Sequence, residues 1–285
     1  MTVALIQLPY DSGHRETRSG RGPGHLITAG AAERIRAAGQ DPVPAAIHSD
    51  HTVPAEIATG FELCGKLAGE VTRARRDGAW PLVLAGNCLS AVGTVAGLHE
   101  VPRLGVVWLD AHGDLNTPET TLSGFLDGMA LAVTAGWCFR ALAKTAPGFE
   151  AVDEANILHA GGRAWDAGER AVFQTSGMAE VSARDWREHG LLALEQPLSA
   201  LARRVDAVYL HIDMDVHDAG EMRANPFASA NGPTAEQVRA GIQRVTEQVP
   251  VAAAGMAGLD PGCDADGAAT RAALDLIGTL AGSRG

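Results

Sequence analysis

The chain lacks a dense cluster of basic residues and lacks a long apolar run. It has 23 Lys and Arg against 34 Asp and Glu, and its formal net charge is −11 at pH 7. The densest basic stretch, TRARR at 72–76, falls inside an expected helix. We therefore expect no nucleic-acid groove, because such grooves concentrate positive charge. No apolar run approaches the roughly 20 residues of a membrane span, so we expect no membrane association.

Cysteine is scarce as well. The four cysteines, Cys64, Cys88, Cys138 and Cys263, form no Cys-x-x-Cys pair. Their spacing therefore indicates neither a disulfide framework nor a thiolate zinc site. We expect reduced thiols in a cytoplasmic protein. The N-terminal MTVALIQL has no basic segment and no small-residue cleavage site, which favours a first strand over a signal peptide.

Short apolar runs alternate with longer helical patterns along the chain. Continuous apolar runs predict strands at 3–8, 81–86, 104–110, 155–161, 206–215 and 251–260. Between them, helices are expected at 24–38, 55–77, 88–98, 126–136, 167–175, 234–247 and 267–281. This alternation predicts an α/β fold, a parallel sheet with helices on both faces. No segment is long enough to act as a linker, so we expect one domain over 1–285.

Two of the predicted strands end in clusters of acidic side chains. Asp110, His112 and Asp114 follow LGVVW at two-residue spacing, and Asp213 and Asp215 end YLHIDMD at the same spacing. Residues two apart point to one side of an extended chain. In parallel sheets, sites lie beyond the carboxyl ends of the strands. We therefore expect these five side chains to converge on one point.

So many bunched carboxylates would repel one another, and burial would raise the pKa of at least one. One or two divalent cations would relieve that cost. Oxygen ligands with a single nitrogen suit Mn²⁺, Mg²⁺ or Fe²⁺ better than a zinc site rich in thiolates. A pair of such ions lowers the pKa of a shared water and yields hydroxide near neutral pH.

The segments DAHGDLNTPET, SGFLDGMALA and HIDMDVHD, with GGRAWDAGE between them, resemble the arginase/agmatinase family of ureohydrolases. The resemblance covers most of the chain. It implies a three-layer α/β/α fold with a mostly parallel sheet, two Mn²⁺ per chain, and assembly as a homo-oligomer, a trimer or hexamer. It also implies hydrolysis of a C–N bond in a linear amidine by attack of metal-bound hydroxide.

The resemblance assigns roles to the acidic clusters. It implies that Asp110 and Asp213 bridge the two ions, that Asp114 completes the shell of one ion, and that His112 and Asp215 complete the other. An imidazole must be neutral to bind a metal.

The resemblance also implies an amino-acid substrate. Asn116 and Ser123 match positions that bind an α-carboxylate in arginases, and Asp166 and Glu169 match positions that hold the α-amino group.

Four positions depart from the family pattern. Cys88 stands where the family has a metal-binding His, and it follows Asn87 in place of an Asp. Gly258 stands where arginases place a Glu that binds the guanidinium group, and Asp127 where they place a proton-shuttling His. A Cys at this position is similar to the branch that hydrolyses Nω-hydroxy-L-arginine to an ornithine-like amine in antibiotic biosynthesis. We therefore expect catalytic roles for Asp127 and Cys88, a modified guanidine as substrate, and one weakened metal site.

Four alternatives remain open from the residues alone. Cys88 is a metal ligand, since it replaces one, or a buried hydrophobe, as free cysteines usually are. It could instead be the nucleophile of a cysteine hydrolase, activated by a helix N-terminus or by His112. The chain could also be an arginase-like binding protein that has lost catalysis.

Overall fold

The computed structural model describes residues 1–283 and is built around one large sheet. Its strands are β1 (Thr2–Leu8), β4 (Asp41–Ala46), β5 (Trp80–Ala85), β6 (Leu104–Leu109), β7 (Ile157–Ala160), β8 (Ala179–Val181), β9 (Ala207–Asp213) and β10 (Val251–Ala257). They are ordered β4-β1-β5-β10-β9-β6-β7-β8, and every neighbouring pair is parallel. A separate hairpin joins β2 (Tyr10–Asp11) to β3 (His14–Arg15). The predicted α/β fold with a parallel sheet is confirmed.

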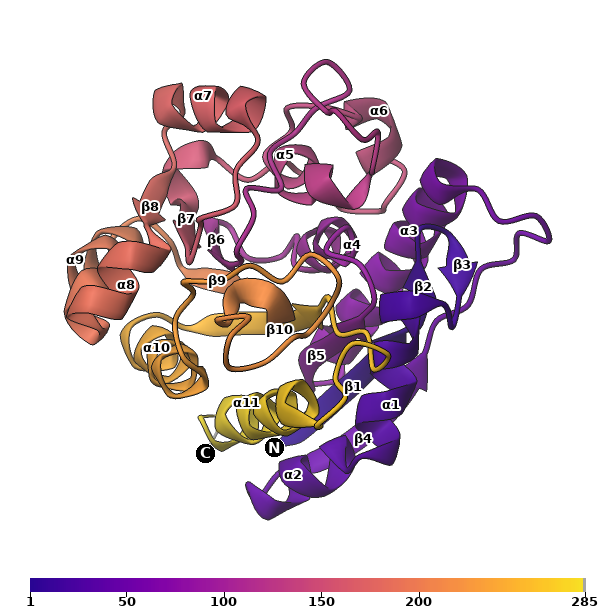
Figure 1. Cartoon of the computed structure of the whole chain (residues 1–285). Coiled ribbons are helices and arrows are strands. Elements are labelled where there is room, and N and C mark those ends of the chain that lie inside the picture. Colours follow the sequence, from indigo (N-terminus) through magenta and orange to yellow (C-terminus); the bar gives the residue numbers. More distant parts are fainter. Residues whose placement is uncertain (284–285) are drawn as a thin grey trace.

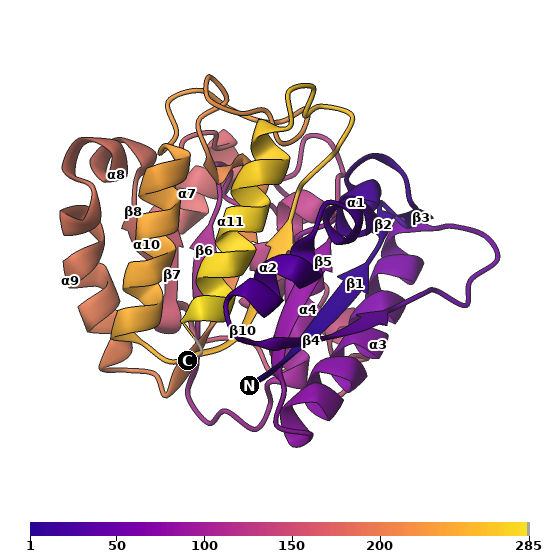
Figure 2. The same cartoon turned by 90° about the horizontal axis from the view of Figure 1, so that it is seen from below.

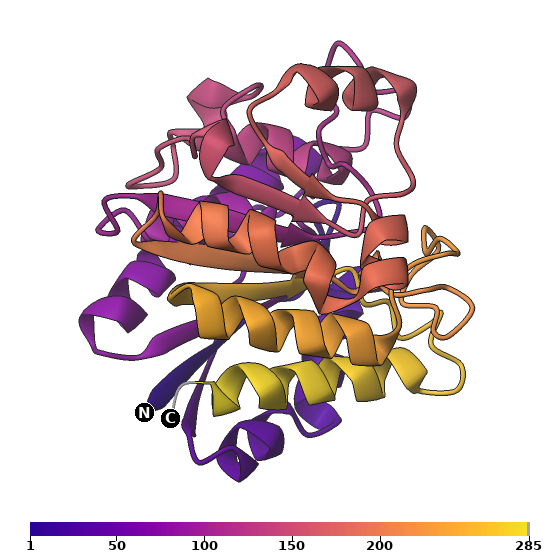
Figure 3. The ribbon, with the colours of Figure 1, turned by 90° about the vertical axis from the view of Figure 1, so that its left-hand side faces the viewer.

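Helices cover both faces of the sheet (Figure 1). On one face lie α3 (Glu56–Arg76), α4 (Ser90–Gly97) and α5 (Ala130–Thr134). On the other lie α1 (Gly22–Thr28), α2 (Ala31–Ala37), α8 (Ala183–His189), α9 (Leu191–Ala202), α10 (Ala235–Gln248) and α11 (Ala268–Gly282). Figures 2 and 3 show α9, α10, α11 and α2 side by side in this second layer. The shorter α6 (Arg140–Ala143) and α7 (Ala167–Thr175) follow β6 and β7.

Two buried apolar clusters, one on each face of the sheet, fill the space between these layers. This is why the strands read as continuous apolar runs: both faces of each central strand are covered. Among residues 1–283, none of the helices combines the length and the apolar character needed to cross a membrane.

The six predicted strands are all present, with ends that differ by a few residues. The hairpin strands β2 and β3 were not predicted, and the two unpredicted strands of the large sheet, β4 and β8, lie at its edges. Strand β4 has prolines at 42 and 44, which edge strands tolerate, and β8 has only three residues. The helix predicted at 24–38 is divided into α1 and α2 by a turn at 29–30, and α6, α8 and α9 were not predicted.

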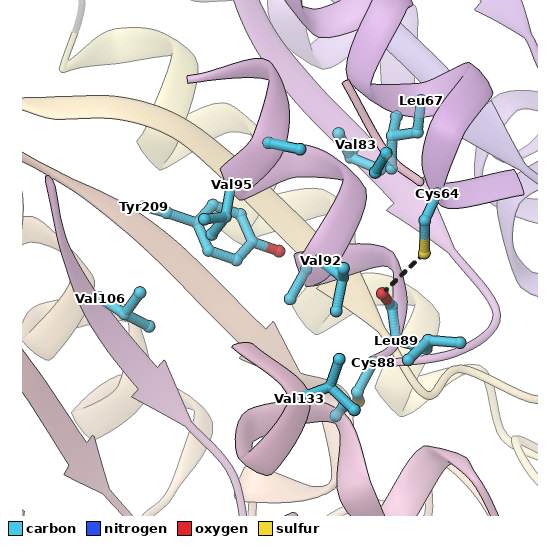
Figure 4. Close-up of a cluster of buried hydrophobic side chains, with 14 of the residues drawn as sticks. Cys64, Leu67, Val83, Cys88, Leu89, Val92, Val95, Val106, Val133 and Tyr209 are labelled. Atoms are coloured by element: carbon cyan, nitrogen blue, oxygen red, sulfur yellow. Dashed lines mark hydrogen bonds between the residues drawn. The ribbon is translucent and has the colours of Figure 1, made fainter. Parts of the chain in front are cut away.

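The packing of α3 on α4 positions the segment that carries Cys88. A Cβ added to Gly93 would lie 2.6 Å from the carbonyl oxygen of Cys64, so only glycine lets the two helices approach this closely. The Cys64 thiol donates a hydrogen bond to the carbonyl oxygen of Leu89 at 3.4 Å, as Figure 4 shows. The turn between β5 and α4 is therefore held against α3.

Candidate metal centre and active site

A cavity of about 220 Å³ opens at the carboxyl ends of the central strands β5, β10, β9 and β6. Its lining residues are Asp11, Ser19, Gly86, Asn87, Cys88, His112, Asp114, Asn116, Thr121, Ser123, Phe125, Asp127, Gly128, Ala164, Asp166, Glu169, Asp213, Asp215, Asn225, Phe227 and Gly258. Nearly all of the predicted site residues are among them. Segments far apart in the sequence meet here because the sheet places their strands next to one another.

Asp110, His112 and Asp114 do converge, but not by the alternation of an extended strand. Strand β6 ends at Leu109, and the segment after it is irregular, with Asp114 in the left-handed region at φ 50°. The Asp110 carboxylate accepts a hydrogen bond from the backbone N–H of His112 at 2.7 Å and one from Trp108 Nε1 at 3.0 Å. Hydrogen bonds from Trp108 and His112 therefore fix the Asp110 carboxylate.

Two groups of donors could each hold a metal ion. One comprises Cys88, Asp110 and Asp114, the other Asp110, His112 and Asp215, and the ligand atoms of each group lie within 4.8 Å of one another. Asp110 belongs to both groups and so lies between two candidate ion positions. Asp213 belongs to neither in this structure, but its carboxylate faces the same cavity and accepts a hydrogen bond from Cys88 Sγ at 3.0 Å.

The charge of the site fits divalent cations. Burial raises the pKa of Asp110, Asp114 and Asp213, and neighbouring carboxylates raise each pKa further. Among the described residues that line the cavity there is no Lys or Arg. His112 supplies the imidazole of this lining. Burial lowers its pKa, but Asp215 and Asp110 outweigh this and raise the pKa to about 12. One imidazolium cannot neutralise so many carboxylates, whereas hard divalent cations bind this oxygen-rich set well.

Asp215 is the exception among these acids. Its burial would raise the pKa, but the charge of His112 and several hydrogen bonds outweigh that effect and lower the pKa to about 2. Asn225 Nδ2 donates to Asp215 Oδ2 at 3.0 Å, and the backbone N–H of Ala111 donates to Oδ1 at 3.4 Å. Asp215 is therefore held in place by Asn225 and by the backbone of Ala111.

Cys88 is a buried thiol rather than an activated nucleophile. Its side chain is 2% exposed, and burial, followed by the charge of Asp213, raises its pKa well above the usual value. Its hydrogen-bond partner is the Asp213 carboxylate and not His112. A cysteine hydrolase needs a nearby cation to stabilise the thiolate, so the geometry does not support that alternative.

Asp127 is held by the segment that carries Cys88. Asn87 Nδ2 donates to Asp127 Oδ2 at 2.7 Å, and the backbone N–H of Leu89 donates to Oδ1 at 2.9 Å. Asn87 Oδ1 in turn accepts from the backbone N–H of Ser12 at 2.8 Å. Burial raises the pKa of Asp127 to about 7 despite these hydrogen bonds. The group can therefore hold or release a proton near neutral pH.

Gly258 leaves no room for the side chain that the family resemblance places there. A Cβ at this position would lie 2.4 Å and 2.5 Å from the two carboxylate oxygens of Asp213. The residue also has φ 76°, which favours glycine. The Asp213 carboxylate thus occupies the space beside this backbone, and the missing Glu has no substitute there.

The loop expected to bind the amino-acid head group is tied together by its own side chains. Asn116 Nδ2 donates to Asp166 Oδ2 at 2.9 Å. Glu169 is 3% exposed, and its carboxylate accepts the backbone N–H groups of Asp166 at 2.8 Å and of Leu115 at 3.1 Å. Ser123 is exposed at the cavity rim. Glu169 therefore shapes the loop, and Asn116, Ser123 and Asp166 face the cavity.

Arg163 lies within the GGRAWDAGE segment, and no role was predicted for it. Its guanidinium group donates to the backbone carbonyl oxygens of Gly161, Asp215, Val216, His217, Ser229 and Ala230 at 2.8–3.1 Å. Most of these carbonyls belong to the segment after β9. Arg163 therefore fixes the backbone of the metal-ligand loop, a function that no local sequence pattern indicates.

Comparisons with known proteins agree with this site. The model of the Arginase family matches residues 1–282. The chain is 28% identical to the arginase of Bacillus caldovelox, covering 99% of this chain and 98% of that protein, and 30% identical to human arginase-1, covering 87% and 80%. The crystal structure of arginase from Bacillus cereus superposes with a TM-score of 0.90 at 28% identity and 99% coverage of both chains. The chain therefore belongs to the arginase family of metal-dependent ureohydrolases, which hydrolyse guanidino C–N bonds.

Proposed function

We propose that this chain hydrolyses a guanidino or modified-guanidino amino acid and releases an ornithine-like amine with a urea-type product. The observation that carries the proposal is the convergence of the two donor groups that share Asp110 within one cavity. Divalent cations bound there, with Mn²⁺ the proposed pair, would supply Lewis acidity and an activated water. The chain is proposed to act as a cytoplasmic homo-oligomer.

The protein's own residues bind the substrate and handle protons. Asn116, Ser123 and Asp166 line one side of the cavity and offer an amide, a hydroxyl and a carboxylate to an amino-acid head group. Asp127 also lines the cavity, hydrogen-bonded to Asn87, and the pKa of about 7 allows its carboxyl oxygens to supply the proton that the departing amine takes up.

A modified guanidine fits this cavity better than arginine itself. The Asp213 carboxylate fills the space beside Gly258, so no separate carboxylate pairs with a fully charged guanidinium there. An N-hydroxyguanidine is less basic and needs that counter-charge less. We propose Nω-hydroxy-L-arginine as the preferred substrate, which would suit an antibiotic-biosynthesis role.

The metal stoichiometry is a separate part of the proposal. Thiolate is a soft ligand and Mn²⁺ prefers oxygen and nitrogen. The Cys88 thiol is also engaged with Asp213. We therefore propose that the ion in the group of Cys88, Asp110 and Asp114 binds more weakly than the ion held by His112 and Asp215.

The direct test measures ornithine release by the Mn²⁺-loaded full chain from Nω-hydroxy-L-arginine and from L-arginine at equal concentration. We expect kcat/KM at least tenfold higher for the hydroxylated substrate, and loss of both activities after EDTA treatment. Treatment with a thiol-alkylating reagent should leave activity intact, because Cys88 is buried, whereas a Cys88-dependent hydrolase would lose activity on alkylation of Cys88 and survive EDTA.

Equal or greater turnover of arginine would contradict the preference for a modified guanidine. The assignment of ureohydrolase activity would still hold. Less than about half an ion per chain after growth with manganese, with no turnover of either compound, would favour a binding protein instead. A matched control is Asp218→Asn, because Asp218 lies on the same loop as Asp215 but outside the cavity lining. It should retain full activity, whereas Asp215→Asn should lose it.

A further inference from the structure

Two phenylalanine rings meet over the cavity from different loops. Phe125 lies on the segment after β6, and Phe227 on the segment after β9. Their ring centroids are 5.8 Å apart and their planes are inclined by 33°. This lies within the 4.5–7 Å range typical of interacting aromatic pairs. The pair therefore connects two loops that are distant from one another in the sequence.

The rings differ in kind from the rest of the lining. Among the described residues around the cavity, all the others are acidic, polar or small. Phe125 and Phe227 thus supply the large apolar surface there. The Phe227 side chain is 58% exposed and lines the cavity, so its ring is accessible to a ligand there.

Phe227 is linked through Asn225 to the candidate metal ligand Asp215. Its backbone N–H donates to Asn225 Oδ1 at 2.9 Å. Asn225 is 3% exposed, and its Nδ2 donates to Asp215 Oδ2 at 3.0 Å and to the carbonyl oxygen of Gly258 at 2.9 Å. One fully bonded amide therefore sets the distance between the aromatic rim and the candidate metal ligand.

Phe125 is held through hydrogen bonds of the residues that follow it in the chain. Two residues later, Asp127 is bound by Asn87 and by the backbone of Leu89, and the N–H of Leu126 donates to Glu56 Oε1 at 3.3 Å. Both rings are therefore held at the entrance, while the acidic donors lie at the buried end.

This arrangement matches the parts of an extended amino acid. The reactive group must reach the buried carboxylates, and the polar head group suits Asn116 and Asp166. The methylene stem between them needs an apolar surface, and the two rings are where the cavity offers one. We propose, on the basis of the proposed function, that Phe125 and Phe227 bind the substrate's methylene stem and determine which stem length is accepted.

The test uses calorimetric binding of two probes to the Mn²⁺-loaded full chain, L-ornithine and L-2,4-diaminobutyrate, which differ by one methylene. Burial of one methylene increases affinity about fourfold, so we expect ornithine to bind about fourfold more tightly. In Phe227→Ala that ratio should fall below about twofold, while Phe227→Leu, which keeps an apolar side chain, should retain it.

Kinetics provide a second readout. Phe227→Ala should raise KM for the guanidino substrate about tenfold with kcat changed less than about threefold, since the rings bind the stem and do not touch the reacting bond. The matched control is Leu122→Ala, because Leu122 is 88% exposed on the same loop as Phe125 but lies outside the cavity lining. It should change neither quantity.

The outcomes separate this inference from the proposed function. An unchanged affinity ratio in a folded, metal-loaded Phe227→Ala would overturn the inference, whether or not the wild type hydrolyses a guanidine. The wild type could instead turn over no guanidino amino acid and still bind ornithine about fourfold more tightly than diaminobutyrate, with this preference lost in Phe227→Ala. That result would overturn the proposed function and support the role of the rings.

Discussion

The two walls of the cavity are built in opposite ways. The wall after β9 carries Asp215 and is fixed through its backbone, because Arg163 binds six carbonyl oxygens, most of them in that wall. The wall after β5 carries two of the departures from the family pattern, and its side chains bind those of other segments. Asn87 bonds Asp127, and Cys88 bonds Asp213.

This contrast indicates that the departures depend on one another. An Asp at position 87 would place two carboxylates together, since Asp127 accepts the hydrogen bond that the Asn87 amide donates. A side chain at 258 would displace the Asp213 carboxylate that the Cys88 thiol contacts. Substitutions in the wall after β5 should therefore act mainly on the site, while loss of the Arg163 contacts in the wall after β9 should act mainly on stability.

The largest effect is expected when the wall after β9 loses its clamp. Arg163→Leu would leave several buried carbonyl oxygens without a donor, each costing about 1–3 kcal/mol. We expect the free energy of unfolding, measured by urea denaturation, to fall by about 3–5 kcal/mol. Arg184→Leu is the control, because that arginine is 82% exposed and pairs only with Glu188 in its own helix. Equal losses in the two variants would show that the carbonyl contacts do not stabilise the loop.

A middle-sized effect is expected on the wall after β5. Cys88→His would offer Mn²⁺ an imidazole nitrogen in place of a buried thiol. We expect the weaker ion to bind at least about tenfold more tightly, as measured by equilibrium dialysis with elemental analysis. Cys138→Ala, which removes another buried thiol outside the donor groups, should leave the metal content unchanged. If Cys88→His also leaves it unchanged, the thiol does not limit metal binding.

The smallest effect is expected at Glu62, an acid outside the cavity. Its pKa is lowered, whereas the pKa values of Asp110, Asp114 and Asp213 are raised. Burial of Glu62 would raise its pKa, but hydrogen bonds from the Asp50 backbone, Ser49 and Lys66 outweigh this and lower the pKa to about 2. The ionised form is thus stabilised by folding. Its contribution is fully present above the unfolded pKa of 4.5 and is lost as pH falls toward 2.

The variant that tests this is Glu62→Gln. Because the side chain is partly solvated, we expect the variant to lose about 1 kcal/mol of unfolding free energy at pH 6 and to match the wild type near pH 2. Chemical denaturation across that pH range provides the measurement. A difference that stays constant with pH would mean that the carboxylate charge contributes nothing.

Much of the fold was predictable because the central strands are apolar on both faces and stand out as continuous runs. The edge strands were not, since the prolines of β4 and the brevity of β8 conceal them. The convergence of Asp110, His112 and Asp114 was anticipated, yet strand alternation was the wrong reason for it. Strand β6 ends at Leu109 and Asp114 has φ 50°, while hydrogen bonds from Trp108 and His112 fix the Asp110 carboxylate.

The order of residues alone specifies which donor types stand at the ends of which strands, and hence that hard divalent cations suit the chain. The guanidino-type substrate was implied by the family resemblance. The folded structure was needed to show that Cys88 faces Asp213, that the space beside Gly258 is already filled, and that Phe125 meets Phe227. The cause lies in the strand order β5-β10-β9-β6, which differs from the order along the chain. Contacts between side chains from these strands depend on that order, and no local pattern encodes it.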